Sequence, residues 1–160
     1  MKKLIIIFFM LLVSDLWAQD SLIYHPELNA AEQIKSATIK ATAENKHVLL
    51  MIGGNWCRWC KMFNKFVTAD FQLDSAMNKN FVVEHINYSK ENKNAETLKK
   101  LHFPERFGFP VFVILNSAGE LIHTQNSAYL EKGEGYDKET VIDFFNQWRK
   151  DALDEKNYKN

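Results

Sequence analysis

The sequence predicts an α/β fold in which helices cover both faces of a central mixed β-sheet. Segments with apolar residues at helical spacing alternate with short apolar runs. One of these runs, Val48-Leu49-Leu50-Met51-Ile52, is continuous, which is typical of a strand covered on both faces. A polar turn at 116–119 separates two further apolar runs and predicts a hairpin. The sheet should therefore be parallel in its first part and antiparallel at the hairpin.

Local signals place the elements in order. Asn29, followed by Glu32, resembles a capping box and starts the first helix, Pro104 ends a later one, and Asp137 is the expected N-cap of the last. The expected helices cover 30–44, a stretch from about Cys57, 70–78, 95–101, and a final segment whose buried side is Val141, Phe145, Trp148 and Ala152. The expected strands cover 47–52, 81–86, 111–115 and 120–124.

The N-terminus has the layout of a secretory signal peptide. Two lysines precede an apolar run of ten residues, 4–13, and Ala18 provides a small residue at the expected cut. The run is shorter than the roughly 20 residues that span a bilayer. We expect residues 1–18 to be a signal peptide and residues 19–160 to form one domain that is exported to the periplasm. An uncleaved anchor is the alternative.

Charge argues against nucleic acid as a partner. Removal of residues 1–18 takes away Lys2, Lys3 and Asp15, which leaves 18 basic and 19 acidic residues. Phosphate binding needs a clustered basic excess, and this composition lacks one. Export would also place the two cysteines in an oxidising compartment.

Both cysteines lie in one motif, Trp56-Cys57-Arg58-Trp59-Cys60-Lys61, between a buried strand and a helix. Unpaired amides and the helix dipole at such a junction favour a thiolate at Cys57, the nucleophile in disulfide exchange. Cys60 lies about one turn further on, where its sulfur can close on that of Cys57. We expect Cys57 to attack and Cys60 to resolve.

The segment 48–61 resembles the active-site segment of the thioredoxin superfamily, especially its exported members with Trp-Cys-x-x-Cys-Lys. Gly108-Phe109-Pro110-Val111 and the hairpin after it resemble the family's cis-proline loop, so the similarity covers most of 29–152. The resemblance implies a thioredoxin-like fold and a cis bond before Pro110. It also implies that Pro110 faces the cysteines, while the backbone of Phe109 pairs with a substrate strand.

Two departures from that family stand out. Thioredoxins usually carry a buried acid six positions before the first cysteine, where it assists proton transfer at the second; this position is Met51 here. Another proton acceptor, or water, would have to serve. The segment 126–136 is also longer than the minimal connection between hairpin and last helix, and we expect a tolerated insertion rather than a docking loop.

Other interpretations of the motif are weaker. A purely structural Cys57–Cys60 disulfide would close a very short loop and so remove little chain entropy. A closed zinc site needs four ligands, whereas the histidines are scattered along the chain, at His25, His47, His85, His102 and His123. We therefore expect no metal, and no cofactor beyond the redox pair.

Aromatic and charged neighbours complete the predicted site. Trp59 and Phe109 are candidates for an apolar collar that holds extended protein substrates, together with Pro110. Trp56 fits either a core position or a place beside the sulfurs. Arg58 fits a solvated charge, or a cation that lowers the pKa of Cys57.

The predicted function is that of a thiol:disulfide oxidoreductase, an enzyme that exchanges disulfides with protein substrates through Cys57 and Cys60. Its expected partners are protein thiols and disulfides, with a membrane thiol relay as a candidate electron source, and the protein should be a monomer without stable membrane insertion. The alternative is a non-catalytic, peptide-binding or chaperone-like module with the same fold.

Overall fold

The structure is a computed structural model that describes residues 22–159. The predicted signal peptide, 1–18, lies outside the described residues. The helices are α1 (Ala30–Glu44), α2 (Arg58–Ala69), α3 (Phe71–Asn80), α4 (Ala95–Lys100) and α5 (Lys138–Gln147). The strands are β1 (His47–Gly53), β2 (Phe81–Asn87), β3 (Val111–Leu115), β4 (Leu121–Asn126), β5 (Glu131–Lys132) and β6 (Gly135–Tyr136). Short 3₁₀ turns cover Pro104–Phe107, Ser127–Leu130, Lys150–Leu153 and Glu155–Tyr158.

A four-stranded mixed sheet in the order β2-β1-β3-β4 forms the centre of the molecule. β1 pairs in parallel with β2 and antiparallel with β3, and β3 pairs antiparallel with β4. The mixed sheet is as predicted, but antiparallel pairing already begins between β1 and β3, one strand before the hairpin. β1 is therefore the central strand, and every residue of it is buried.

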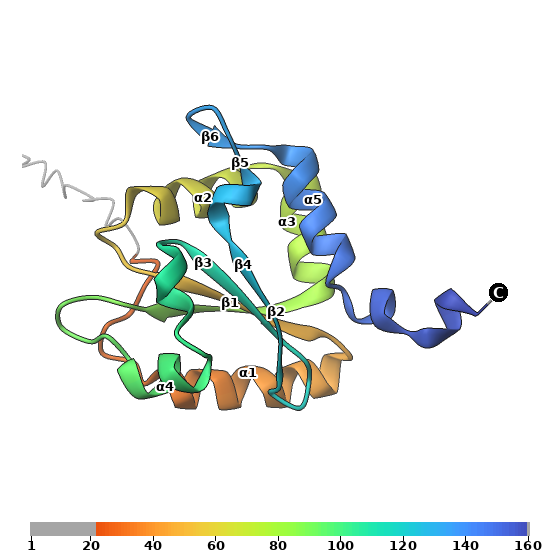
Figure 1. Ribbon diagram of the computed structural model, residues 1–160, viewed down its shortest axis with the longest axis horizontal. Helices are drawn as coiled ribbons and strands as arrows, with labels where there is room; N and C mark the ends of the chain where they lie inside the picture. The colour runs from red at the N-terminus through yellow and green to blue at the C-terminus, as the bar shows by residue number, and fades with distance from the viewer. Residues whose placement is uncertain (1–21, 160) are drawn as a thin grey trace, which may run out of the picture.

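Helices cover both faces of this sheet, as predicted (Figure 1). α2, α3 and α5 pack on one face, where alternate residues of β1 and β3 such as Met51 and Phe112 enter a large apolar cluster. α1 and α4 pack on the other face, against the intervening residues such as Leu50 and Val113. This alternation follows the period of two along a strand. The sheet is therefore buried from both sides along β1 and β3.

Polar caps define the helix starts that the sequence indicates. The side chain of Asn29 accepts hydrogen bonds from the amides of Ala31 and Glu32, at 2.9 and 3.2 Å. Asp137 accepts one from the amide of Thr140 at 3.0 Å. Each cap satisfies amides that a helix leaves without intrahelical partners.

The last helix is shorter than predicted. α5 ends at Gln147, so Ala152 belongs to a separate 3₁₀ turn and not to its buried side. The ring of His47 donates a hydrogen bond from Nδ1 to the carbonyl of Trp148 at 2.9 Å. This contact gives the carbonyl at the C-cap a partner outside the helix.

The segment 126–136, expected to be an insertion, has structure of its own. It forms a 3₁₀ turn and the small β5–β6 hairpin, and it returns Leu130 and Tyr136 to the core cluster beneath α2. The hydroxyl of Tyr136 donates to the carbonyl of Trp59 at 3.3 Å. This part of the chain therefore supports the helix that carries the cysteines.

Phe63 packs α2 against the sheet, and its removal should destabilise the protein. Its ring is fully buried, 4.5 Å from the ring of Phe112 and 4.9 Å from that of Tyr136 between centroids. Phe63→Ala should reduce the free energy of unfolding by about 3–5 kcal/mol, because it removes this contact area and leaves a cavity. Urea denaturation measures the loss. Phe71→Ala is the matched control: its ring is 84% exposed, and a loss comparable to that of Phe63→Ala would contradict the assignment.

His85 should make stability depend on pH. Desolvation by burial lowers its pKa from 6.5 to about 4. The unfolded state therefore binds more protons between these two values, and stability should fall as the pH falls from about 6.5 to 4. His85→Gln removes this titration, so unfolding midpoints measured across that range should change less with pH than in the parent protein. Equal slopes in the two proteins would refute the prediction.

Candidate redox site at the start of α2

A disulfide joins Cys57 and Cys60 at the start of α2. Cys57 is the N-cap residue, with an extended backbone, and its Sγ accepts a hydrogen bond from the amide of Cys60 at 3.1 Å. The same amide would stabilise a thiolate at Cys57 after reduction, as would the positive end of the helix dipole. Cys57 is 4% exposed and Cys60 1%, so both cysteines are largely covered.

Two glycines at the end of β1 allow side chains to approach the backbone closely. A Cβ atom on Gly53 would lie 2.5 Å from Sγ of Cys60 and 2.9 Å from the hydroxyl oxygen of Tyr24. A Cβ atom on Gly54 would lie 2.4 Å from Nε1 of Trp56. These positions are too close for any side chain, so both glycines are required by the packing of the site.

The cis-proline loop lies beside the disulfide. The bond between Phe109 and Pro110 is cis, as the resemblance implies. Pro110 is buried, and the half-buried ring of Phe109 packs against the cluster that Tyr24 forms with the two cysteines. The ring of Phe109 also lies 4.8 Å from that of Tyr88 and 5.5 Å from that of Trp56. Residues from α2 and from the loop before β3 thus meet at one place.

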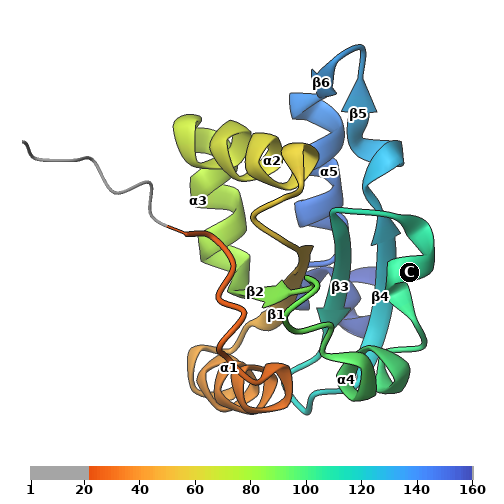
Figure 2. The ribbon, with the colours of Figure 1, turned by 90° about the vertical axis from the view of Figure 1, so that its left-hand side faces the viewer.

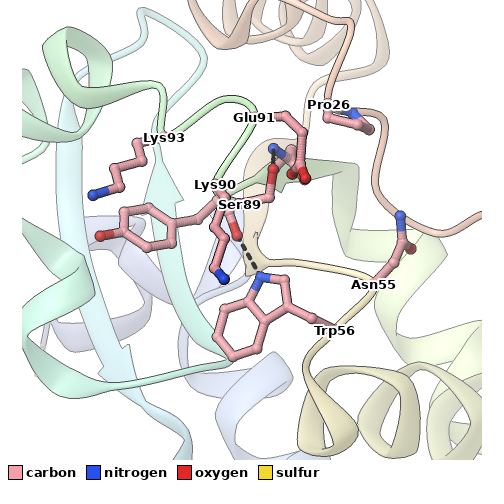
Figure 3. A pocket seen from close by; sticks show the side chains of 9 residues that line it. Pro26, Asn55, Trp56, Ser89, Lys90, Glu91 and Lys93 are labelled. Carbon is pink, nitrogen blue, oxygen red and sulfur yellow. Dashed lines mark hydrogen bonds between the residues drawn. The ribbon is translucent and has the colours of Figure 1, made fainter.

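Trp56 belongs to the surface of the site. It is 59% exposed, which excludes the core position that the sequence left open. Its indole N–H donates to the carbonyl of Tyr88 at 2.7 Å, so the ring is fixed although it faces solvent. The ring forms one side of an open pocket of about 640 Å³, shown in Figure 3, with Pro26, Asn55 and the loop 87–93 as its other sides.

The remaining residues that the sequence analysis named differ in how far they are exposed. Trp59 is half-buried and packs edge-on against Tyr136 at 5.6 Å, so only part of its ring is available to a substrate. Arg58 is exposed. Met51, at the position of the family's acid, is buried within the apolar cluster of the α2 face.

Tyr24 and Asn55 were not singled out by the sequence, yet both contribute to the site. The Asn55 side chain accepts from the amides of Ile23 and Tyr24, each at 3.1 Å, and donates to the carbonyl of Tyr24 at 2.6 Å. Residues 22–28 therefore run past the start of α2 on their way to α1 (Figure 2). The buried Tyr24 lies against both cysteines. Tyr24 and Asn55 are more than 30 positions apart, so no local sequence pattern predicts their contact.

The histidines do not form a common site. Within residues 22–159, no three His, Cys, Asp or Glu side chains gather closely enough to hold a metal ion.

Among the described residues 22–159, no helix is both long and apolar enough to cross a bilayer.

Several solved structures resemble this chain. A disulphide isomerase from Xylella fastidiosa Temecula1 matches with a TM-score of 0.69 and 26% identity, over 79% of this chain and 95% of that one. The oxidised DsbD C-terminal domain of Neisseria meningitidis gives a TM-score of 0.55 at 18% identity, over 74% of this chain and 95% of that one. A thioredoxin from Thermus thermophilus gives 0.51 at 21% identity, over 79% and 86%.

A comparison with curated proteins found no match. A family profile described as thioredoxin-like matches residues 29–117, more than half of the chain, which includes both cysteines and the cis-proline loop. The sheet order, the disulfide at the start of α2 and the cis-proline beside it agree with that match. The chain belongs to the thioredoxin-like family.

Proposed function

We propose that this protein is an exported thiol:disulfide oxidoreductase that exchanges disulfides with protein substrates through Cys57 and Cys60. The observation that carries the proposal is the position of the disulfide: it lies at a helix start, next to a cis-proline and beside an exposed tryptophan. A disulfide that closes a loop this short would add little to the stability of the chain, so a purely structural role does not explain it. The likeness to a disulphide isomerase at 26% identity supports the same reaction class.

Disulfide exchange proceeds in two steps, in which the two cysteines supply both electrons. The Cys57 thiolate attacks a substrate disulfide, a mixed disulfide forms, and one substrate sulfur leaves as a thiolate that takes up a proton. Cys60 then loses its proton and attacks Sγ of Cys57. The bond between Cys57 and the substrate breaks, and the second substrate sulfur leaves. Two electrons have passed to the substrate, and Cys57 and Cys60 are joined again.

Cys57 suits the first step because donors already point at its sulfur. The amide of Cys60 bonds to it in the oxidised protein and remains in place when the disulfide opens. Cys60 is one turn further into the helix and more deeply covered, which suits a group that reacts only with its neighbour. In this proposal Arg58 adds a diffuse positive charge that favours the thiolate further.

Aromatic side chains give the substrate a surface to bind. Trp56 presents a large exposed ring that its hydrogen bond to Tyr88 holds in place, so little entropy is lost when a partner covers it. The ring of Phe109, beside Pro110 in sequence, lies 5.5 Å from that of Trp56 and packs against the cysteine cluster, and the exposed part of Trp59 extends the same surface. An extended peptide between these groups would bring its disulfide to Cys57.

Export is part of the proposal because of the N-terminal sequence. Two lysines, an apolar run and a small residue precede the domain, in the arrangement of a secretory leader. In an exported compartment, a membrane thiol relay is the candidate electron source. The direction of electron flow follows from the reduction potential of the Cys57–Cys60 pair. A value near about −270 mV would indicate a reductant, and one near about −120 mV a strong oxidant.

Cys60→Ala should accumulate substrates as mixed disulfides, whereas Cys57→Ala should not. Deletion of the resolving thiol leaves the first step intact and stalls the second, while deletion of the nucleophile prevents both. Each variant is expressed with its leader, thiols are quenched with acid, and non-reducing gels are compared with reducing gels. Bands heavier than the monomer that disappear on reduction should occur with Cys60→Ala alone.

The two variants are matched because each removes one sulfur of the same disulfide. Equal trapping by both would contradict the assigned roles. If neither variant traps a substrate and the parent protein fails to reduce insulin with dithiothreitol, the chain is a peptide-binding module and not an enzyme.

Trp56→Ala should weaken the binding of protein substrates but not the reaction with small disulfides. Loss of an exposed aromatic contact should lower kcat/KM for insulin reduction roughly tenfold, mainly through KM, and leave the reaction with a small aromatic disulfide nearly unchanged. Tyr129→Ala is the control, since Tyr129 is 76% exposed and lies in the insertion rather than beside the sulfurs. A similar loss with both substrates would show that Trp56 acts on the sulfurs and not on binding.

A further inference from the structure

The resolving cysteine, Cys60, lies in buried surroundings that disfavour a thiolate. Cys60 is 1% exposed and packs in a small buried cluster with Tyr24 and Cys57. A charged sulfur in such surroundings needs a hydrogen-bond donor, because burial disfavours the charged form. Met51 provides none, since it is an apolar residue of the neighbouring cluster.

Tyr24 brings a hydroxyl group to this place. Its oxygen and Sγ of Cys60 converge on the same side of Gly53, at 2.9 and 2.5 Å from the point where a Cβ atom would stand. A side chain on residue 53 would separate or displace them, so the glycine permits their approach. Around the cluster lie the half-buried Ile23 and Phe109, which cannot donate from their side chains, and Trp59, whose ring packs on Tyr136.

The ring of Tyr24 is held in this position from two sides. Asn55 makes three hydrogen bonds to the backbone of residues 23 and 24. The ring itself lies edge-on against His85 of β2, at 5.4 Å between centroids. The backbone and ring of Tyr24 are therefore held near Cys60 before any reaction begins, which limits the reorganisation needed when charge develops on the sulfur.

We propose that the Tyr24 hydroxyl donates a hydrogen bond to the Cys60 thiolate as it attacks the mixed disulfide, with Asn55 as the residue that positions Tyr24. The inference rests on the proposed function, which it deepens by assigning a donor to the resolving step. Cys60 loses its proton and the departing substrate sulfur gains one. Tyr24 keeps its own proton throughout, and the electron pair of the broken sulfur–sulfur bond leaves with the substrate.

The electrostatic surroundings agree with a donor that stays protonated. Burial raises the pKa of Tyr24 well above its ordinary value, so the hydroxyl retains its proton at neutral pH. The titratable groups that face it are His85 from β2, Tyr136 from β6 and the two cysteines. Burial holds the pKa of His85 at about 4, so this ring is neutral above that pH and adds no charge. Arg58 and Lys61, on the same helix as Cys60, are exposed.

The test is the pKa of the Cys60 thiol in the reduced protein, measured by NMR from the shift of its Cβ carbon. Tyr24→Phe keeps the ring and removes the hydroxyl, so it should raise this pKa by about one unit or more, the size of a hydrogen bond to a charged group. The pKa of Cys57 should not change. Tyr129→Phe is the matched control and should leave both values unaltered. An unchanged Cys60 pKa in Tyr24→Phe would overturn the proposal.

A kinetic measurement separates this inference from the proposed function. Reduced protein reacts with 5,5′-dithiobis(2-nitrobenzoate): attack by Cys57 releases one aromatic thiolate, and attack by Cys60 releases the second. At neutral pH, Tyr24→Phe should slow the second release about threefold, because a tenfold smaller thiolate fraction is partly offset by higher nucleophilicity. The first release should be unchanged. If the parent protein shows both releases but does not reduce insulin, and Tyr24→Phe slows the second release, the proposed function fails while the role of Tyr24 stands.

Asn55→Ala tests the positioning role. It should raise the Cys60 pKa in the parent background and have no further effect in Tyr24→Phe, since it acts through the tyrosine. Fully additive changes in the double variant would refute the role assigned to Asn55. Equal unfolding midpoints for Tyr24→Phe and the parent exclude a general loss of structure as the cause.

Discussion

The site depends on the hydrogen bond that opens α2, from the amide of Cys60 to Sγ of Cys57. This bond requires an extended residue at the N-cap, which a short turn connects to β1, a strand whose every residue is buried. The strand fixes the position of Cys57, and the helix provides the donor. Because both elements are held by the core, the sulfur meets the donor without local adjustment. The aromatic side chains then only have to reach this one point.

Support for that geometry comes from parts of the chain that are far apart in sequence. Tyr136, from the insertion after β4, packs beneath α2 against Phe63 and donates to the carbonyl of Trp59. Tyr24, from the segment before α1, covers the cysteines from the other side. The two tyrosines thus differ in role. One holds the helix on the sheet, and the other lies against the reacting atoms.

Periodicity in the sequence was sufficient for most of the fold, because helix and strand faces are set by local spacing. The end of α5 was not predictable in this way. The carbonyl of Trp148, at its C-cap, accepts a hydrogen bond from His47, about 100 residues away, and local spacing carries no signal of such a contact. The exposure of Trp56 was likewise undetermined, because a tryptophan next to a cysteine motif fits a core or a surface position equally well. Cys57, Cys60 and Pro110 were found from the motif and the family resemblance. Tyr24 and Asn55 have no motif, and only the folded chain brings them to the sulfurs.

The strand order also determines when the site comes into being during synthesis. β1 precedes the cysteines, but its antiparallel neighbour β3 and the cis-proline loop follow about 50 residues later. Both thiols are therefore synthesised before the residues that cover them in the folded protein. Until those residues follow, neither β3 nor the cis-proline loop shields the pair. Oxidation of Cys57 and Cys60 therefore does not have to wait for folding of the sheet that later surrounds them.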